Sequence, residues 1–270
     1  MASGTRRSIR ASAIALVCAA ALSVTAHAAD VHVLATGALS TAFKELIPAF
    51  ERDTGNRLLI SWGPSYGTSP DALPMRIKNG EPMDVCFMIS AALDEQIKQG
   101  ALISETKSDI AESAVGVAVR AGIPTPDVST PAKLKETLLS AKSVAFSEGA
   151  SGTYITEVLF PKLGIAEQMK PKSVLIRGRE LVGAALQRGD ADLGLQQISE
   201  LKAFKDIQFV GPLPPEVQKV SVISAAVSRH AQQAEAAEAF IAFLKSRHAV
   251  AVFDRTGLQH PQVRDQAKSN

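Results

Sequence analysis

Two short runs of small and hydroxyl residues have the composition of anion-binding turns. Each run follows an apolar stretch that reads as a strand and precedes a predicted helix. The first backbone N–H groups of a helix lack intrahelical partners and carry partial positive charge, so such a turn holds a small anion. The residues that we expect to bind it are Thr36, Gly37 and Ala38 in the first run and Ser151, Gly152 and Thr153 in the second.

Two longer side chains are further candidates. Arg179 lies near the start of a predicted helix over 178–188, where positive charge opposes the helix dipole unless it faces an anion. Tyr66 lies in the Gly/Pro-rich loop 62–70 and is placed to close over a ligand. The alternative for Arg179 is a solvated surface position, and for the two turns it is a simple strand–helix junction.

These residues need strands and helices that alternate along the chain. Apolar strands are predicted at 31–36, 58–62, 85–89, 114–120, 143–147, 193–196 and 217–228. Amphipathic or Ala-rich helices are predicted at 39–52, 71–78, 91–99, 131–140, 154–163, 178–188, 232–245 and 249–255. This alternation predicts an α/β fold with mainly parallel sheets flanked by helices. Ligands in such folds bind beyond the carboxyl ends of the strands.

Two connectors, near 111–117 and near 211–225, predict a discontinuous first lobe. Residues 29–113 and 222–270 would form lobe one, and residues 114–221 would form lobe two. The two anion-binding turns then face each other across a cleft.

The amino terminus has the pattern of a secretory signal. Residues 1–28 combine three early arginines with an apolar stretch over 11–24 that is too short to span a membrane. A small-x-small motif ends at Ala28, so we expect cleavage there and a soluble, monomeric protein in the periplasm. An Arg-Arg pair also fits the twin-arginine signal loosely, so the export route stays open.

Composition excludes several classes of function. Loss of the three signal arginines lowers the basic residues from 29 to 26 against 27 acids, so the net charge changes from +2 to −1. No basic field favours nucleic acid. The one cysteine left, Cys86, lies in an apolar run and is expected to be a buried hydrophobe. No metal-ligand spacing, nucleotide-binding loop or Ser-His-Asp grouping occurs, so we expect no metal and no cofactor.

Four motifs together resemble the periplasmic molybdate-binding protein family, within the type II solute-binding-protein fold. They are the segments at 33–39, 76–85, 149–154 and 189–194, and their order covers nearly the whole mature chain. The resemblance implies two lobes, a hinge and capture of an oxyanion by neutral donors.

The resemblance also implies particular contacts. The family's first hydroxyl position falls on Ala38, its second within 62–69, with Ser65 as first candidate, and its late tyrosine on Gln197. A further contact falls near Arg179. Two family hydroxyls are therefore replaced while an arginine is gained, and a guanidinium suits a planar carboxylate better than a tetrahedral dianion. We expect an organic di- or tricarboxylate rather than molybdate.

Two functions remain open. One is a solute receptor that delivers a small anion to the permease of an ABC-type importer. The other is an isomerase, because the chain also resembles aconitate isomerase, a member of the same superfamily, which moves a proton between trans- and cis-aconitate. Such an enzyme needs a proton carrier, for which Glu180, Glu148 and Tyr154 are candidates.

Overall fold

The computed structural model describes residue 1 and residues 28–261, and their strands form one mixed sheet of nine strands. The strand order is β2-β1-β3-β9-β4-β7-β5-β6, with β8 paired to β4. The bounds are β1 (Asp30–Thr36), β2 (Arg57–Gly63), β3 (Val85–Ile89), β4 (Ser108–Arg120), β5 (Val144–Ser147), β6 (Ser173–Ile176), β7 (Leu193–Gln197), β8 (Ile207–Pro212) and β9 (Val220–Val227). The α/β class is confirmed.

The expectation of mainly parallel sheets, one to a lobe, is wrong. Four of the eight strand pairings are antiparallel, and all four involve β4 or β9. These two strands carry the chain between two halves of the fold and therefore run against their neighbours. The first half contains β1, β2 and β3, and the second half contains β5, β6, β7 and β8. Residues 108–114 of β4 pair with β9, whereas residues 115–120 pair with β7 and β8, so one strand joins both halves into a continuous sheet.

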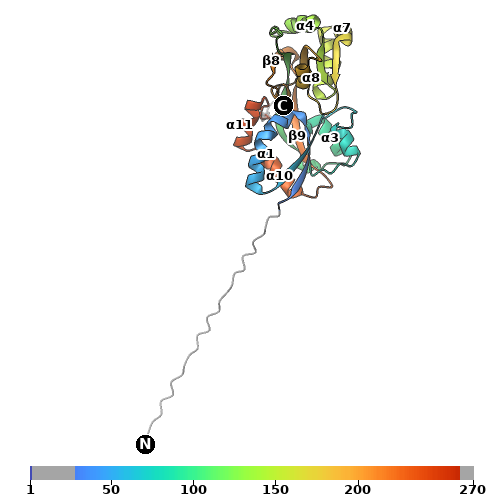
Figure 1. Ribbon diagram of the computed structural model, residues 1–270. Coiled ribbons are helices and arrows are strands. Elements are labelled where there is room, and N and C mark those ends of the chain that lie inside the picture. Colours follow the sequence, from blue (N-terminus) through green and yellow to red (C-terminus); the bar gives the residue numbers. More distant parts are fainter. Residues whose placement is uncertain (2–27, 262–270) are drawn as a thin grey trace, which may run out of the picture.

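The first half packs a buried sheet between helices on both faces (Figure 1). In β3, alternate side chains enter different cores: Phe87 packs with α1 and α10, whereas Cys86 and Met88 pack on the side of α3. The Phe87 ring meets Phe43 and Phe240 at centroid distances of 5.3 and 5.7 Å. The helices of this half are α1 (Ser40–Thr54), α2 (Leu73–Lys78), α3 (Ser90–Lys98), α10 (Ala234–Phe243) and α11 (Arg247–Thr256).

The second half has two further cores on the faces of β4, β5 and β7. Val117 and Leu195 face one of them, and Ala118 and Ala145 face the other. The elements that cover these faces are α4 (Pro131–Ser140), α5 (Ala150–Tyr154), the π-helical turn η3 (Ile155–Leu159), α6 (Phe160–Leu163), α7 (Ala166–Met169), α8 (Val182–Arg188) and α9 (Ile198–Leu201). Short 3₁₀ turns complete the fold at η1 (Gly37–Leu39), η2 (Ser104–Thr106), η4 (Lys170–Lys172) and η5 (Pro215–Val217).

Several predicted elements differ from the structure. The helix predicted over 154–163 begins at Ala150 and is interrupted by a π-helical turn, and the strand predicted over 217–228 begins at Val220. The helix predicted over 178–188 begins only at Val182, so residues 178–181 form a loop. The connector predicted near 211–225 holds the end of strand β8, the turn η5 and most of strand β9. The strand predicted over 114–120 is six residues longer at its start. No helix of the described residues is long and apolar enough to cross a membrane, and the predicted signal lies almost wholly outside that part of the chain.

Candidate functional site

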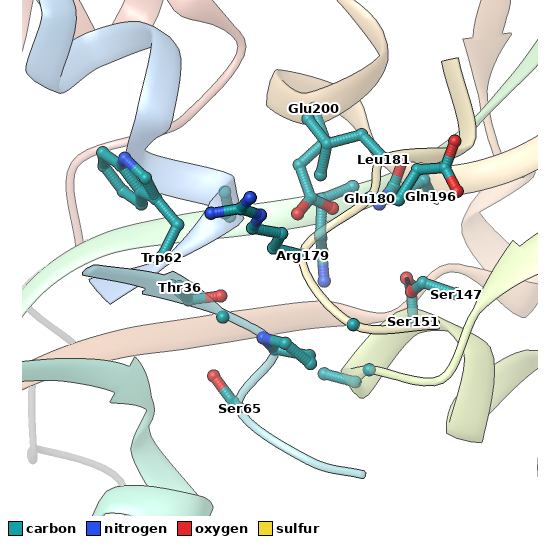
Figure 2. A pocket seen from close by; sticks show the side chains of 18 of the residues that line it. Thr36, Trp62, Ser65, Ser147, Ser151, Arg179, Glu180, Leu181, Gln196 and Glu200 are labelled. Carbon is teal, nitrogen blue, oxygen red and sulfur yellow. Dashed lines mark hydrogen bonds between the residues drawn. The ribbon is translucent and has the colours of Figure 1, made fainter. Parts of the chain in front are cut away.

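Residues at the carboxyl ends of five strands, β1, β2, β3, β5 and β7, line one pocket. Figure 2 shows the side chains that line it. The cavity volume of the pocket is about 40 Å³, so its walls lie close together. Both halves of the fold contribute to its wall, as the α/β pattern predicts. The lining residues are Thr36, Gly37, Ala38, Trp62, Gly63, Pro64, Ser65, Ile89, Ser147, Gly149, Ala150, Ser151, Gly178, Arg179, Glu180, Leu181, Gln196, Gln197 and Glu200.

The first half supplies neutral donors. The turn after β1 runs directly into η1, and the buried Thr36 hydroxyl makes no capping bond to it. Ser65 is 2% exposed, and its Oγ accepts the backbone N–H of Ile89 at 3.0 Å. Since the oxygen of Ser65 is thereby engaged as an acceptor, its hydroxyl proton is left for a ligand.

The second half repeats this arrangement at the start of α5. The hydroxyls of Ser147 and Ser151 lie 3.4 Å apart, and both line the pocket. Gly152 lies behind them, where a Cβ would come within 1.5 Å of the Ser147 carbonyl oxygen. Only a glycine therefore lets the helix approach the end of β5 so closely.

Replacing Gly152 by alanine is expected to destabilise the fold by about 3 kcal/mol or more, because the methyl group overlaps backbone that cannot move aside. Urea denaturation measures this loss. The matched control is Thr153→Ala, which removes a partly buried hydroxyl bonded within its own helix to Gly149 O and is expected to cost about 1 kcal/mol. Equal stability of the two variants contradicts the packing argument.

Two adjacent glutamines close the wall at the end of β7. Gln196 Oε1 accepts the N–H of Val182 at 2.8 Å and so anchors the loop before α8. Gln197 Oε1 accepts the hydroxyl of Ser113 at 2.8 Å, while its Nε2 is buried and has no hydrogen-bond partner among the described residues. A buried donor without a partner is costly, and a bound ligand oxygen would satisfy it.

Arg179 lies in the loop before α8 rather than at a helix start, so the helix-dipole argument made for it is wrong. It still lines the pocket, and within residues 28–261 it forms no ion pair. Its neighbour Arg177 is exposed, lies outside the lining and approaches Glu148 at 3.8 Å. Arg179 is thus the one cation that lines the pocket in the described part of the chain.

Glu200 lines the pocket and was missed by the sequence analysis. It lies on α9, directly after β7, and burial raises the pKa of its carboxyl to about 8, against the effect of a backbone hydrogen bond from Gln197. A Cβ on Gly37 would lie 2.7 Å from Glu200 Oε1, so the carboxyl packs against the first anion-binding turn. Figure 2 shows the Glu200 carboxyl on the pocket side, whereas that of Glu180 points away.

The structure brings most of the predicted ligand-binding residues to this pocket but not all. Those that line it are Thr36, Gly37, Ala38, Ser65, Ser151, Arg179 and Gln197. Those outside the lining are Tyr66, Gly152 and Thr153. Tyr66 packs against two cores of the first half, and burial raises the pKa of its hydroxyl. The described residues contain no group of three or more potential metal ligands.

The three candidate proton carriers are engaged elsewhere. Glu148 is buried outside the lining, and its Oε1 accepts the N–H of Gly178 at 2.7 Å. Tyr154 donates its hydroxyl to Val217 O at 2.7 Å and also lies outside the lining. Glu180 lines the pocket, but its carboxyl pairs with Arg188.

Comparison with known proteins places the chain in a family. Residues 31–259 match the model of the bacterial extracellular solute-binding proteins, and the chain belongs to that family. It is 39% identical over 227 residues to an aconitate isomerase of a Pseudomonas species, with 84% of this chain and 86% of the relative covered.

Two solved structures share the fold. The periplasmic molybdate-binding protein of Azotobacter vinelandii superposes with a TM-score of 0.65 at 21% identity, covering 86% of this chain and 100% of that chain. The sulfate-binding protein SubI of Mycobacterium tuberculosis superposes with a TM-score of 0.69 at 18% identity, covering 87% and 88%. The resemblance to molybdate-binding proteins seen in the sequence is confirmed, and the fold is that of type II periplasmic binding proteins.

Proposed function

We propose that this chain is an isomerase that interconverts trans- and cis-aconitate by moving a proton across the allylic system. The observation that carries the proposal is the pocket, which combines anion donors from both halves with one arginine and one buried carboxyl. The 39% identity to an aconitate isomerase over most of both chains supports the same reaction.

The donors suit a carboxylate better than a tetrahedral oxyanion. Ala38 offers only its backbone N–H where the molybdate-binding pattern has a hydroxyl, and Gln197 offers an amide where that pattern has a tyrosine. Arg179 adds a planar guanidinium that pairs with a carboxylate through two parallel hydrogen bonds. The serine hydroxyls, the backbone N–H groups and the glutamine amide are then available to bind the other two carboxylates of aconitate.

The proposed enzyme has two lobes that close on the substrate. The cores support a division at residues 29–113 plus 222–270 and residues 114–221, because the core of each half draws its side chains from within these limits. The pocket lies where these halves meet. Export to the periplasm, with cleavage near Ala28, belongs to the same proposal and agrees with an extracellular family.

The second candidate is a receptor that binds a small organic anion and delivers it as a monomer to an ABC-type importer. The family and the fold support it, since both solved relatives are named for an anion that they bind. The buried Glu200 argues against it. A carboxyl that ionises near a polyanion weakens the attraction of a binding site, whereas an enzyme that moves a proton needs such a group.

Ultraviolet absorbance separates the candidates. Purified protein is mixed with trans-aconitate, and the absorbance change of conversion to the cis isomer is followed over time. We expect turnover. Calorimetric binding of trans-aconitate without any conversion makes the chain a receptor, and tight binding of molybdate or sulfate without aconitate binding overturns the proposal.

A further inference from the structure

We infer that Glu200 is the catalytic residue that carries the proton, an inference that rests on the proposed isomerisation of aconitate. Neither the sequence motifs nor the resemblance pointed to this residue.

Two strands place Glu200: β7, which leads into its helix, and β1, whose following turn packs against its carboxyl. Helix α9 begins directly after β7, whose last residue, Gln197, presents an unpartnered Nε2 in the same pocket wall. From the other half, the turn after β1 brings Gly37 against the Glu200 carboxyl, with 2.7 Å between the position of a Gly37 Cβ and Oε1. A ligand held by this turn is therefore in contact with the carboxyl.

No cation neutralises Glu200 among the described residues. Its carboxyl takes part in no ion pair, and the charged side chains that share the pocket lining are Arg179 and Glu180. The turn η1 and strand β7, which pack against α9, carry no charged side chain. The other charged side chains on elements packed against α9 lie outside the lining: Lys44, Glu45, Glu51, Arg52 and Asp53 on α1, Asp109, Glu112 and Arg120 on β4, and Arg188 on α8.

This setting gives Glu200 the properties of a proton carrier. A buried carboxyl with a structural role is paired with a cation or accepts several hydrogen bonds. Glu200 accepts one backbone hydrogen bond and has no cation partner among the described residues. Burial raises the pKa of Glu200 to about 8, so the protonated acid and the carboxylate are both populated near neutral pH. A group that takes and returns a proton needs both forms. The other carboxyl in the pocket lining, that of Glu180, is engaged in an ion pair with Arg188.

The reaction balances with this single group. The Glu200 carboxylate takes a proton from the CH₂ of trans-aconitate, and the C–H electron pair forms the new C=C bond. The electrons of the old double bond move to the far carbon, and Arg179 with the neutral donors stabilises the charge that spreads onto the adjoining carboxylate. The Glu200 carboxylic acid then returns a proton to the far carbon, which becomes the new CH₂. No net proton, electron or co-reactant is consumed.

The pH dependence follows from the ionised form being the base. Because burial raises the pKa of Glu200 to about 8, the fraction of carboxylate grows with pH, and kcat/KM is expected to rise up to about pH 8 and then level off. The same burial lowers stability as the pH rises through this range, since the folded protein must release a proton that the unfolded chain releases at lower pH. Glu200→Gln removes both effects.

The test compares five proteins with trans-aconitate: wild type, Glu200→Gln, Glu200→Asp, Glu180→Gln and Glu167→Gln. Glu200→Gln is expected to lose at least about 100-fold in kcat while its calorimetric affinity stays within about threefold of wild type and its Tm no longer falls between pH 6 and 9. Glu200→Asp is expected to recover part of the activity and to keep a pH-dependent kcat/KM. Glu167→Gln, at an exposed position on α7, is expected to match wild type.

Four results overturn the assignment. An active wild type together with a Glu200→Gln variant that keeps more than about a tenth of its kcat excludes Glu200 as the proton carrier and leaves the isomerase intact. A wild-type kcat/KM that stays flat from pH 6 to 9 does the same, as does loss of activity in Glu180→Gln with retention in Glu200→Gln. A wild type with no turnover overturns the proposed function and this inference together.

Discussion

Replacing Arg179 by alanine is expected to weaken trans-aconitate binding about 100-fold, because two charge-assisted hydrogen bonds to a carboxylate are lost. Arg179 is the one cation that lines the pocket within residues 28–261, and it forms no ion pair there. The guanidinium therefore has no competing partner to give up when a ligand enters. Isothermal titration calorimetry of the two proteins measures the loss.

The control for this prediction lies two residues away. Arg177 is exposed, as Arg179 is, but it lies outside the pocket lining and approaches Glu148 only at 3.8 Å, so Arg177→Ala removes a guanidinium that does not face the ligand. Its affinity is expected to stay within about threefold of wild type, as for exposed ion pairs. Arg179→Lys keeps the charge but not the planar fork and is expected to fall between the two. Equal losses for Arg177→Ala and Arg179→Ala contradict a specific carboxylate contact.

Replacing Asp84 by alanine is expected to lower the free energy of unfolding by about 4 kcal/mol, since three backbone donors lose a charged acceptor. Asp84 is 2% exposed at the start of β3. Its Oδ2 accepts the N–H of His32 at 2.7 Å, and its Oδ1 accepts those of Gln232 and Gln233 at 2.7 and 2.9 Å. One carboxylate thus ties β1, β3 and the entry to α10 together.

Urea denaturation tests this prediction against Asp94→Ala. Asp94 pairs with Lys107 at 2.6 Å, but its side chain is 44% exposed. Such a surface pair is worth less than about 1 kcal/mol, so Asp94→Ala is expected to unfold at nearly the wild-type urea concentration. A loss for Asp84→Ala no larger than for Asp94→Ala shows that these three bonds do not hold the first half together.

The sequence predicts the buried, regular elements well. The run Val85–Ile89 is apolar throughout because both of its faces are covered, and its predicted and observed bounds agree. Helix Pro131–Ser140 also agrees, since Thr130 caps it through the N–H of Lys133 and proline starts it. In both elements local pattern and tertiary packing favour the same structure.

Strands that form only because they pair with segments distant in the chain are not predicted from the local sequence. Residues 108–113 of β4 carry Asp109 and Glu112 and lack strict apolar alternation; they become a strand because they pair with β9, more than a hundred residues later. The Pro- and Gly-containing segment of β8 is a strand for the same reason, as it lies along β4. Sheet pairing here overrides local turn composition.

The residues of the candidate site also divide into those that the local sequence predicts and those that depend on distant partners. The two anion-binding turns are local features of strand–turn–helix sequences, and both contribute to the pocket. Glu200 carries no local signal, because it lies on a four-residue helix and the turn at Gly37 that packs against its carboxyl comes from the other half of the fold. The engagement of Glu148 and Tyr154 is equally invisible in sequence, since their partners are 30 and 63 residues away.

Proton NMR of the two isomers tests the central claim, isomerisation of aconitate, most directly. The purified protein is incubated in one sample with trans-aconitate and in another with cis-aconitate, and the vinylic signals of both isomers are followed in each. An isomerase brings both samples to the same final ratio, at rates proportional to its concentration. Spectra that stay unchanged in both samples, while calorimetry detects aconitate binding, contradict the account and make the chain a receptor.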